Sequence, residues 1–126
     1  MLKCVEVLKH NYISQSGKKM NELSVAVLEG YLQEAYKDTA TEQGLFMKLV
    51  EEVGETAEIL NIRAGRKAGA GDTTTELACE LVDIIHYAVS IAAINNIDLS
   101  KAIIEKDKKA AIKYRRTTTL EEYMKK

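Results

Sequence analysis

Two short clusters of acidic residues are the part of this sequence whose residue types and spacing most suggest chemistry. The first cluster comprises Glu51, Glu52 and Glu55, and the second comprises Glu80 and Asp83. The second cluster lies in a run of residues, 77–85, that is otherwise apolar, so we expect the helix that carries it to be buried. A buried carboxylate is costly unless a cation or a hydrogen-bond donor compensates it. Because no Lys or Arg lies in this run, the second cluster indicates a bound metal cation.

Each cluster contains a pair of acids three residues apart, Glu52 with Glu55 and Glu80 with Asp83. On a helix such pairs share one face, with Cβ atoms roughly 5–6 Å apart. If the two helices face each other, four oxygen donors meet, and this set suits a hard divalent cation. Mg²⁺ prefers such ligands and often completes its coordination with substrate phosphates, and Mn²⁺ is an alternative. Zn²⁺ is disfavoured because no Cys or His lies at ligand spacing in the clusters.

The first cluster also has a purely structural interpretation. Taken alone, it is typical of a solvated helix face with a Lys48–Glu52 ion pair worth a few tenths of a kcal/mol. This interpretation does not explain Glu80 and Asp83 in an apolar helix, so we favour the metal site. The spacing Asp83-x-x-His86 resembles half of a di-iron motif, which needs a Glu-x-x-His on each of two helices. We therefore expect His86 to lie on the flank of its helix and to contact a neighbour or a partner chain.

Hydrophobic periodicity predicts four helices joined by short connections. We expect them at about residues 21–37, 42–64, 74–95 and 98–114, with a last turn around residues 120–123. Asp72 or Thr73 caps the third helix and Asp98 caps the fourth. The predicted fold class is all-α, an antiparallel four-helix bundle completed by oligomerisation. Residues 1–19 fit either a short strand or a helix.

The length and composition of the chain are those of one domain spanning residues 1–126, with its core at about residues 20–115. Hydrophobic residues make up 46% of the chain, and there is no Pro or Trp. The formal charge of −1 gives no basic field for nucleic acid. No stretch of 18 apolar residues lacks charge, so we expect no membrane span. Cys4 and Cys79 are too few for a disulfide framework, and Cys79 is interpreted as a small core residue, which predicts a reducing, cytoplasmic location.

The third predicted helix is apolar on nearly every side, which indicates more apolar surface than one chain can cover. We expect a group of its later residues to pack against a second copy of the chain. This group comprises Val89, Ile91, Ala92 and Ile94.

The two clusters together resemble a known family signature. Glu51-Glu52-x-x-Glu55 followed by Glu80-x-x-Asp83 is similar to the E-E-x-x-E…E-x-x-D signature of the all-α nucleoside triphosphate pyrophosphohydrolases. That superfamily includes MazG, the dCTP pyrophosphatases, dimeric dUTPases and phosphoribosyl-ATP pyrophosphohydrolase. The resemblance covers about residues 20–115 and is greatest to the single-domain MazG-like and dCTP-pyrophosphatase branch.

The resemblance implies a Mg²⁺-dependent enzyme that cuts a nucleotide between its α- and β-phosphates, releasing a nucleoside monophosphate and pyrophosphate. It implies that Glu51 orients or deprotonates the attacking water. Tyr87 matches a position beside the nucleotide, and Lys106 matches a lysine that faces the phosphates. It further implies four metal ligands, Glu52, Glu55, Glu80 and Asp83. Family members are homo-dimers or homo-tetramers, and their active sites can include residues of a neighbouring subunit.

Charge placement adds Lys48, which lies one turn before the first cluster on the acidic face and is a candidate for binding phosphate. Arg63, Arg66 and Lys67 are weaker candidates. The chain departs from the family pattern at Ala110, where an Asn is frequent, and in having no Trp to line a base pocket.

Two other functions remain open from the sequence. Phosphoribosyl-ATP pyrophosphohydrolase shares Lys48-x-x-Glu51-Glu52 and a helix containing Asp83, although the long helix from Asp98 to Arg116 fits MazG-like proteins better. A non-catalytic helical oligomer that binds nucleotide or a partner is an alternative of a different class.

Overall fold

The computed structural model describes residues 22–126, and all regular secondary structure in that range is helical. The all-α expectation is therefore confirmed for this part of the chain. The alternatives for residues 1–19, including Cys4, lie outside the described residues. The helices are α2 (Val25–Tyr36), α3 (Glu42–Arg63), α4 (Thr73–Ile94), α5 (Leu99–Lys113) and α6 (Leu120–Met124).

Each helix is preceded by an N-cap residue. The side chain of that residue accepts a hydrogen bond from the backbone N–H three residues later, which satisfies one of the free N–H donors of the first turn. Asp72 caps α4 by accepting from Thr75 N at 3.1 Å, and Asp98 caps α5 by accepting from Lys101 N at 3.0 Å. The sequence had left Asp72 and Thr73 open as caps, and the structure uses Asp72. Helix α2 begins four residues later than predicted because Ser24 is its N-cap.

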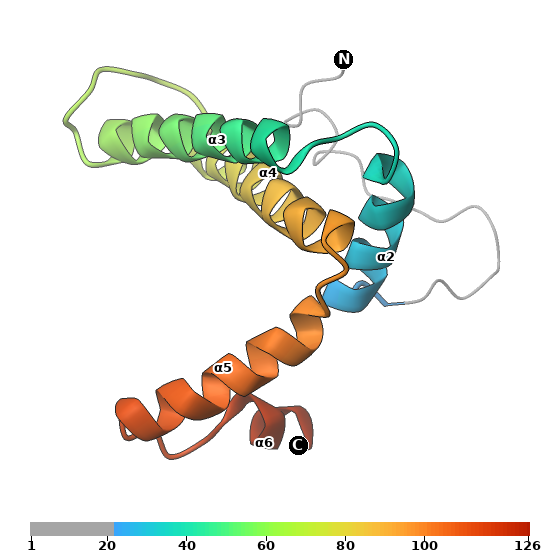
Figure 1. Ribbon diagram of the computed structural model, residues 1–126. Helices are drawn as coiled ribbons and strands as arrows, with labels where there is room; N and C mark the ends of the chain where they lie inside the picture. Colours follow the sequence, from blue (N-terminus) through green and yellow to red (C-terminus); the bar gives the residue numbers. More distant parts are fainter. Residues whose placement is uncertain (1–21) are drawn as a thin grey trace, which may run out of the picture.

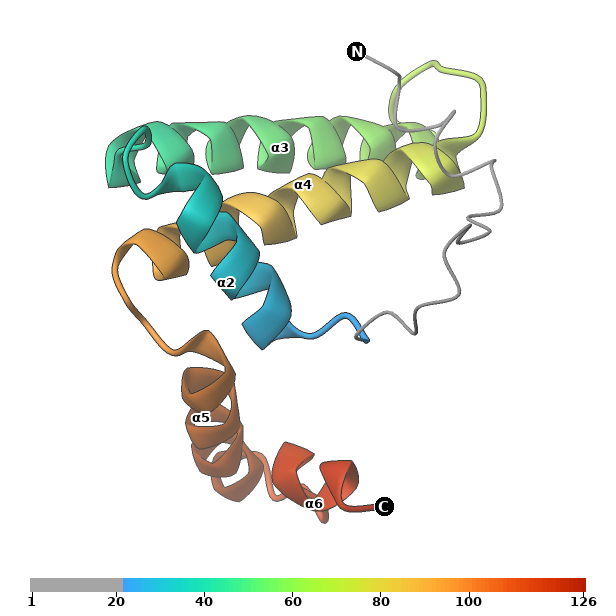
Figure 2. The same cartoon turned by 90° about the vertical axis from the view of Figure 1, so that its right-hand side faces the viewer.

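Helices α3 and α4 form a long antiparallel pair, and α2 crosses α4 near its C-terminal end (Figures 1 and 2). Helices α2, α3 and α4 together form the body of the structure. The hydrophobic core of this body lies between α2 and α4. Leu32, Val89 and Ala93 are buried there, with Leu28, Tyr36 and Leu99 packed around them. Ser90 is also fully buried, and its hydroxyl donates to the His86 carbonyl at 2.6 Å, so its polar group is satisfied within the helix.

The expected contact of the later α4 residues with a second copy is wrong for two of them. Val89 and Ala92 are only 4% and 5% exposed, because α2 and the rest of the body cover them within the chain. Cys79 is buried, as expected, but it is disulfide-bonded and is not the free core cysteine that the sequence predicted. The exposed apolar residues of α4 lie elsewhere, at Leu81, Val82 and Ile85.

Helix α3 leaves an apolar stripe uncovered. The face packed toward α4 contains Leu45, Thr56 and Ile59, whereas four apolar residues on another face of the helix stay exposed. This stripe consists of Phe46, Val50, Val53 and Leu60.

Helix α5 does not join α2, α3 and α4 in a bundle within one chain. It leaves the body after the α4–α5 turn and extends away from α3 and α4, with α6 folded against it (Figures 1 and 2). Asn96 makes this turn with φ of 55°, a left-handed conformation that ends α4. Helix packing with a second copy thus remains a prediction, as does the four-helix bundle.

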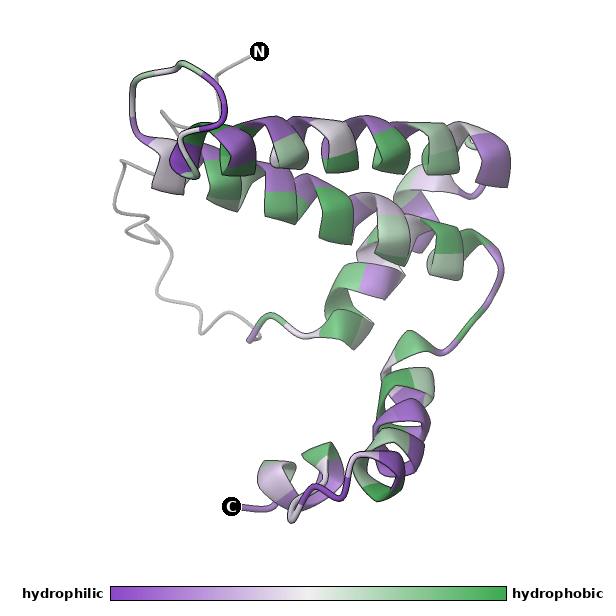
Figure 3. Cartoon of the chain, turned by 90° about the vertical axis from the view of Figure 1, so that its left-hand side faces the viewer, coloured by the Kyte–Doolittle hydropathy of each residue, from purple (hydrophilic) through white to green (hydrophobic). Residues whose placement is uncertain are grey.

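Helix α4 is long and apolar enough to cross a membrane by length and composition alone. The core helix of a soluble bundle passes the same test, and α4 packs against both α2 and α3. Figure 3 shows that apolar residues dominate α4, while polar residues are more frequent along α3 and α5.

Replacing Leu32 by Ala should lower the free energy of unfolding by about 2–5 kcal/mol, because Leu32 is fully buried and its removal leaves a cavity in the core. Chemical denaturation followed by circular dichroism measures this change. Tyr31→Ala is the matched control, since Tyr31 precedes Leu32 on the same helix and is 66% exposed. An equal loss in both variants would contradict this assignment of the core.

Candidate metal centre

Three carboxylates of the two acidic clusters meet where α3 packs against α4. Glu52 comes from α3, and Glu80 and Asp83 come from α4. One oxygen of each lies within 4.8 Å of the others. The i, i+3 spacing of Glu80 and Asp83 puts both on one face of α4, and the antiparallel pairing brings Glu52 against that face. All three residues are half-buried.

One oxygen of the Glu80 carboxylate lacks a hydrogen-bond partner. Its Oε2 atom is buried and has no hydrogen-bond partner among residues 22–126. Ionised Glu52 and Asp83 offer only acceptor oxygens to this site. Only a proton or a cation can therefore compensate the buried Glu80 charge.

Burial and neighbouring negative charge also raise the pKa values of two carboxyl groups in the cluster. Burial, reinforced by the nearby carboxylates of Glu52 and Glu55, raises the pKa of Glu80 from 4.5 to about 8. Burial is also the main cause that raises the pKa of Glu52, and the negative charges of Glu55 and Asp83 act in the same direction. Without a cation, the centre consequently retains a proton at neutral pH.

The three oxygens could together hold a hard divalent cation, and Mg²⁺ gives a scale for the distances. Oxygen ligands lie about 2.1 Å from Mg²⁺, so two ligands on opposite sides of the ion are roughly 4.2 Å apart. Three oxygens within 4.8 Å of one another reach such a distance with small side-chain adjustments. The ligands available are all carboxylates, which is the chemistry of a hard divalent cation rather than of zinc.

Glu55 lies at the edge of this cluster. It is exposed, and it is not one of the three residues whose oxygens lie within 4.8 Å of one another. Its carboxylate is nevertheless close enough to Glu80 and Glu52 to raise the pKa of both. Glu55 is thus placed as an outer member of the predicted ligand set.

Glu51 and Lys48 form an ion pair on the exposed side of α3. Lys48 Nζ lies 3.1 Å from Glu51 Oε2, and both side chains are more than half exposed. The prediction of a Lys48–Glu52 ion pair is wrong, because Glu52 turns toward α4 and Lys48 pairs with Glu51 instead. This pairing with Glu51 raises the pKa of Lys48.

A cavity of about 340 Å³ adjoins the centre and contains two of the predicted substrate-binding residues, Lys48 and Tyr87. The rest of its lining comes from the end of α2, the α2–α3 connection and the start of α3: Tyr36, Thr39, Ala40, Thr41, Gly44 and Leu45. Burial is the main cause that raises the pKa of Tyr87, and the charge of Glu52 adds to it, which places the phenol beside the acidic centre.

Sequence reasoning missed the contribution of Tyr36 and of the connection that follows it. Neither Tyr36 nor residues 38–41 belong to the substrate-binding residues that the sequence predicts, although Tyr36, Thr39, Ala40 and Thr41 line this cavity. The polar composition of the connection next to a helix end was the available signal.

His86 contacts both of the tyrosines that line the cavity. Its Nε2 atom lies 2.8 Å from the Tyr36 hydroxyl, and its ring makes edge-to-face contacts with the rings of Tyr36 and Tyr87. The prediction that His86 contacts a neighbour is confirmed. The contacts support the orientation of the two tyrosines that line the cavity.

The remaining predicted basic residues are not brought to the centre. Lys106 is exposed on α5, which extends away from α3 and α4 (Figure 2). Lys67 pairs with Glu58 near the α3–α4 loop. Arg63 and Arg66 are exposed at the end of α3 and in that loop.

Comparison with known proteins found no matching family model, no matching curated protein and no matching solved structure.

The metal-free protein should lose stability as pH rises from about 4.5 to about 8. Below the lower value Glu80 is protonated in both the folded and unfolded states, so its stabilising contribution is fully present. Between the two values the unfolded state loses the proton while the folded state retains it, so the contribution is lost progressively.

Thermal unfolding in the presence of a chelator, measured across this pH range, tests the loss. Glu80→Gln should flatten most of the pH dependence because Gln does not titrate. Saturating Mg²⁺ should restore stability most strongly near pH 8. An unchanged pH profile in Glu80→Gln would show that the Glu80 carboxyl is not the origin of the pH dependence of stability.

Proposed function

We propose that this chain is a Mg²⁺-dependent nucleoside triphosphate pyrophosphohydrolase, which hydrolyses the α–β phosphoanhydride of (d)NTPs and releases a nucleoside monophosphate and pyrophosphate. The observation that carries the proposal is the buried Glu80 oxygen without a donor, facing the carboxylates of Glu52 and Asp83. The similarity of both acidic clusters to the family signature specifies the reaction class.

The carboxylates of Glu52, Glu80 and Asp83 would hold the metal, with Glu55 at the edge of the set. When bound, Mg²⁺ supplies positive charge that polarises a phosphoryl oxygen and lowers the pKa of water. With a cation held by these residues, the centre would attract anionic phosphates despite the negative charge of its carboxylates. Mn²⁺ is expected to substitute because it accepts the same oxygen ligands.

Glu51 is the proposed residue that orients or deprotonates the attacking water. Its carboxylate is exposed on α3 next to Glu52, so it reaches solvent beside the metal ligands. A carboxylate in this position accepts one proton as water attacks phosphorus, and the pyrophosphate leaves as the anhydride bond breaks. Lys48, paired with Glu51, adds positive charge near the phosphates.

The adjoining cavity is the proposed position of the nucleoside. Tyr36 and Tyr87 provide aromatic walls, and Thr39 and Thr41 belong to the same lining. A volume of about 340 Å³ lies within the range of ligand sites in proteins. Phosphates that extend from this cavity past Lys48 would reach the carboxylates.

Glu52→Gln should reduce turnover of (d)NTPs at least 100-fold and weaken Mg²⁺ binding, because it removes one anionic ligand and leaves an amide in the cluster. A nucleotide panel with resolved products measures turnover, and calorimetry measures metal binding. Glu58→Gln is the matched control, since Glu58 lies on the same helix but pairs with Lys67. Its activity should stay within about twofold of the unchanged protein.

Other outcomes of the same panel point to other functions. Release of orthophosphate and a nucleoside diphosphate would overturn the proposed cleavage position. Activity on phosphoribosyl-ATP alone would favour the histidine-synthesis enzyme. Binding of Mg²⁺ and nucleotide without any turnover would favour the non-catalytic oligomer.

Tyr87→Ala should raise KM for the nucleotide about tenfold with a smaller change in kcat, because the ring would be lost from the cavity wall while the metal ligands stay in place. Tyr87→Phe keeps the ring and serves as the control, with KM close to that of the unchanged protein. Steady-state kinetics at saturating Mg²⁺ separates the two constants. A fall in kcat alone would argue against a nucleoside in this cavity.

A further inference from the structure

Cys79 on α4 is joined through its sulfur to another cysteine. It is disulfide-bonded, and no described cysteine carries a free thiol. The chain contains one other cysteine, Cys4, which lies outside the described residues. Cys79 is only 6% exposed, and the two sulfurs of a disulfide lie about 2.0 Å apart. Because a second copy of the chain would have to reach this buried sulfur, burial favours a bond within one chain, to Cys4.

Cys79 occupies the part of α4 that carries two of the candidate metal ligands. It directly precedes Glu80, and Asp83 lies four residues after it, about one turn further along the same side of the helix. Glu52 of α3 meets the carboxylates of these two residues. A covalent cross-link at Cys79 therefore acts on the stretch of α4 that packs against α3 at the candidate metal centre.

A bond between Cys4 and Cys79 closes a loop that contains both helices packed against α4. The chain between these two positions includes α2 and α3. A disulfide restricts the unfolded chain, and this stabilisation of the folded state grows with the length of the closed loop. Here the loop spans more than half of the sequence. The bond would therefore stabilise the body of α2, α3 and α4 without any additional contact in the folded state.

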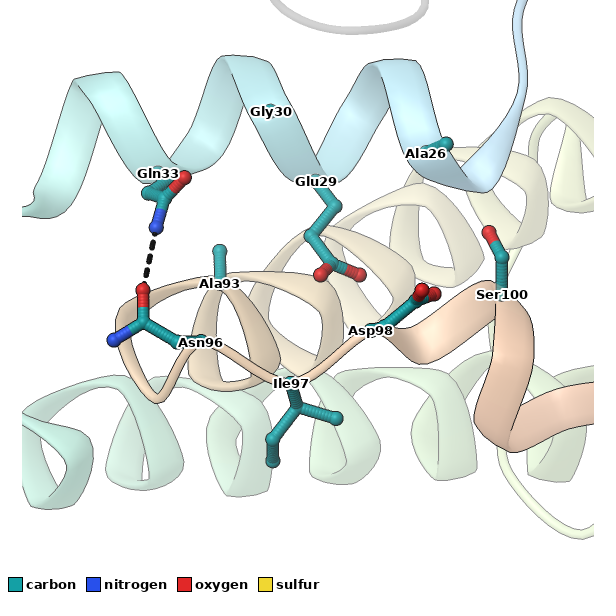
Figure 4. Close-up of a pocket in the computed structure, with 9 residues that line it drawn as sticks. All are labelled: Ala26, Glu29, Gly30, Gln33, Ala93, Asn96, Ile97, Asp98 and Ser100. Carbon is teal, nitrogen blue, oxygen red and sulfur yellow. Dashed lines mark hydrogen bonds between the residues drawn. The ribbon is translucent and has the colours of Figure 1, made fainter.

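Non-covalent packing of α2 on α4 is limited in extent. Among the described residues, the core cluster between these helices consists of Leu32, Val89 and Ala93. Beyond this cluster, Gln33 donates a hydrogen bond to Asn96 at 2.8 Å on an exposed edge. Figure 4 shows this bond beside a cavity of about 380 Å³ between α2 and the α4–α5 connection. A small body with a limited core is marginally stable, so a covalent constraint has a large relative effect on it.

The acidic cluster gives a further reason for a cross-link at this position. Glu52 and Glu80 lie on different helices, and they repel each other when both are ionised and no cation is bound. This repulsion opposes the packing of α3 on α4 directly beside Cys79. A disulfide at Cys79 would stabilise the folded body independently of a cation.

We propose that Cys4 and Cys79 form a reversible disulfide, through which the thiol redox state of the surroundings sets the stability of the body of α2, α3 and α4. The sequence predicts a reducing location, and disulfides that occur in such compartments are usually transient and redox-sensing. The bond is thus a redox-sensitive switch rather than part of a fixed framework. The proposal does not depend on the proposed activity.

A dithiol is the reductant in this switch. One thiolate of the dithiol attacks the Cys4 sulfur, because burial hinders attack at Cys79, and Cys79 leaves as a thiolate that takes up a proton. The second thiol of the dithiol then displaces Cys4 from the mixed disulfide. The protein gains two electrons and two protons as its S–S bond becomes two thiols, and the dithiol is oxidised to a disulfide.

Peptide mapping of the full chain tests the bond itself. The protein is purified without reductant, free thiols are blocked with N-ethylmaleimide in denaturant, and the chain is digested with trypsin. Mass spectrometry should find residues 4–9 linked to residues 68–101, and dithiothreitol should separate the two peptides. Cys79 blocked by N-ethylmaleimide, or residues 68–101 linked to the same peptide of a second copy, would overturn the proposal.

Thermal unfolding in the presence of a chelator tests the effect on stability. Dithiothreitol should lower the unfolding midpoint of the unchanged protein by at least about 5 °C, because it releases the constraint on the unfolded chain. Cys4→Ser removes the bond without changing any residue of α4, so it should show the lower midpoint with or without dithiothreitol. No shift in the unchanged protein, or an equal shift in Cys4→Ser, would contradict the proposal.

A cycle of reduction and oxidation tests whether the bond is a switch. After dithiothreitol is removed and glutathione disulfide is added, the linked peptides and the higher unfolding midpoint should both return. A bond that does not form again in the folded chain would overturn the proposed reversibility. None of these measurements uses nucleotide or Mg²⁺, so their failure would be distinguishable from failure of the proposed activity.

Discussion

The conflict between burial and charge at the contact of α3 with α4 is the constraint on which the rest of this structure depends. Helix α4 must be apolar to pack against both α2 and α3, yet it carries Glu80 and Asp83 on the side that meets Glu52. Desolvation penalises each of these charges, and their mutual repulsion adds to the penalty. A proton relieves the conflict in part, and a divalent cation relieves it more fully because it satisfies several oxygens at once.

Helix α3 presents three different sides. Leu45, Thr56 and Ile59 hold it against α4. Glu51 and Lys48 remain exposed beside the candidate metal ligands, where solvent has access. The apolar stripe containing Phe46 and Val53 stays exposed in the part of the chain that the structure describes.

Rigid support for the site comes from the α2–α4 core. Leu32 and Val89 fix the crossing of α2 over α4, and the hydrogen bond between Tyr36 and His86 fixes the end of α2 beside Tyr87. The cavity wall is thereby attached to α4, which also bears Glu80 and Asp83. This attachment would hold the proposed nucleoside at a constant distance from the proposed metal, as hydrolysis at a fixed phosphate requires.

The sequence by itself determined the helices of the described region and the identity of the acidic clusters. Periodicity, the polar break before Glu42 and the caps Asp72 and Asp98 are local properties, so helix boundaries followed within a few residues. Only the tertiary structure decided which acids meet, that Lys48 pairs with Glu51, that Tyr36 joins the cavity, and that α5 leaves the body. The spacing along a helix fixes which side chains share a face, whereas the rotation and crossing of two packed helices depend on all the residues between them, such as Thr56 and Ser90, whose small buried side chains give no periodic signal.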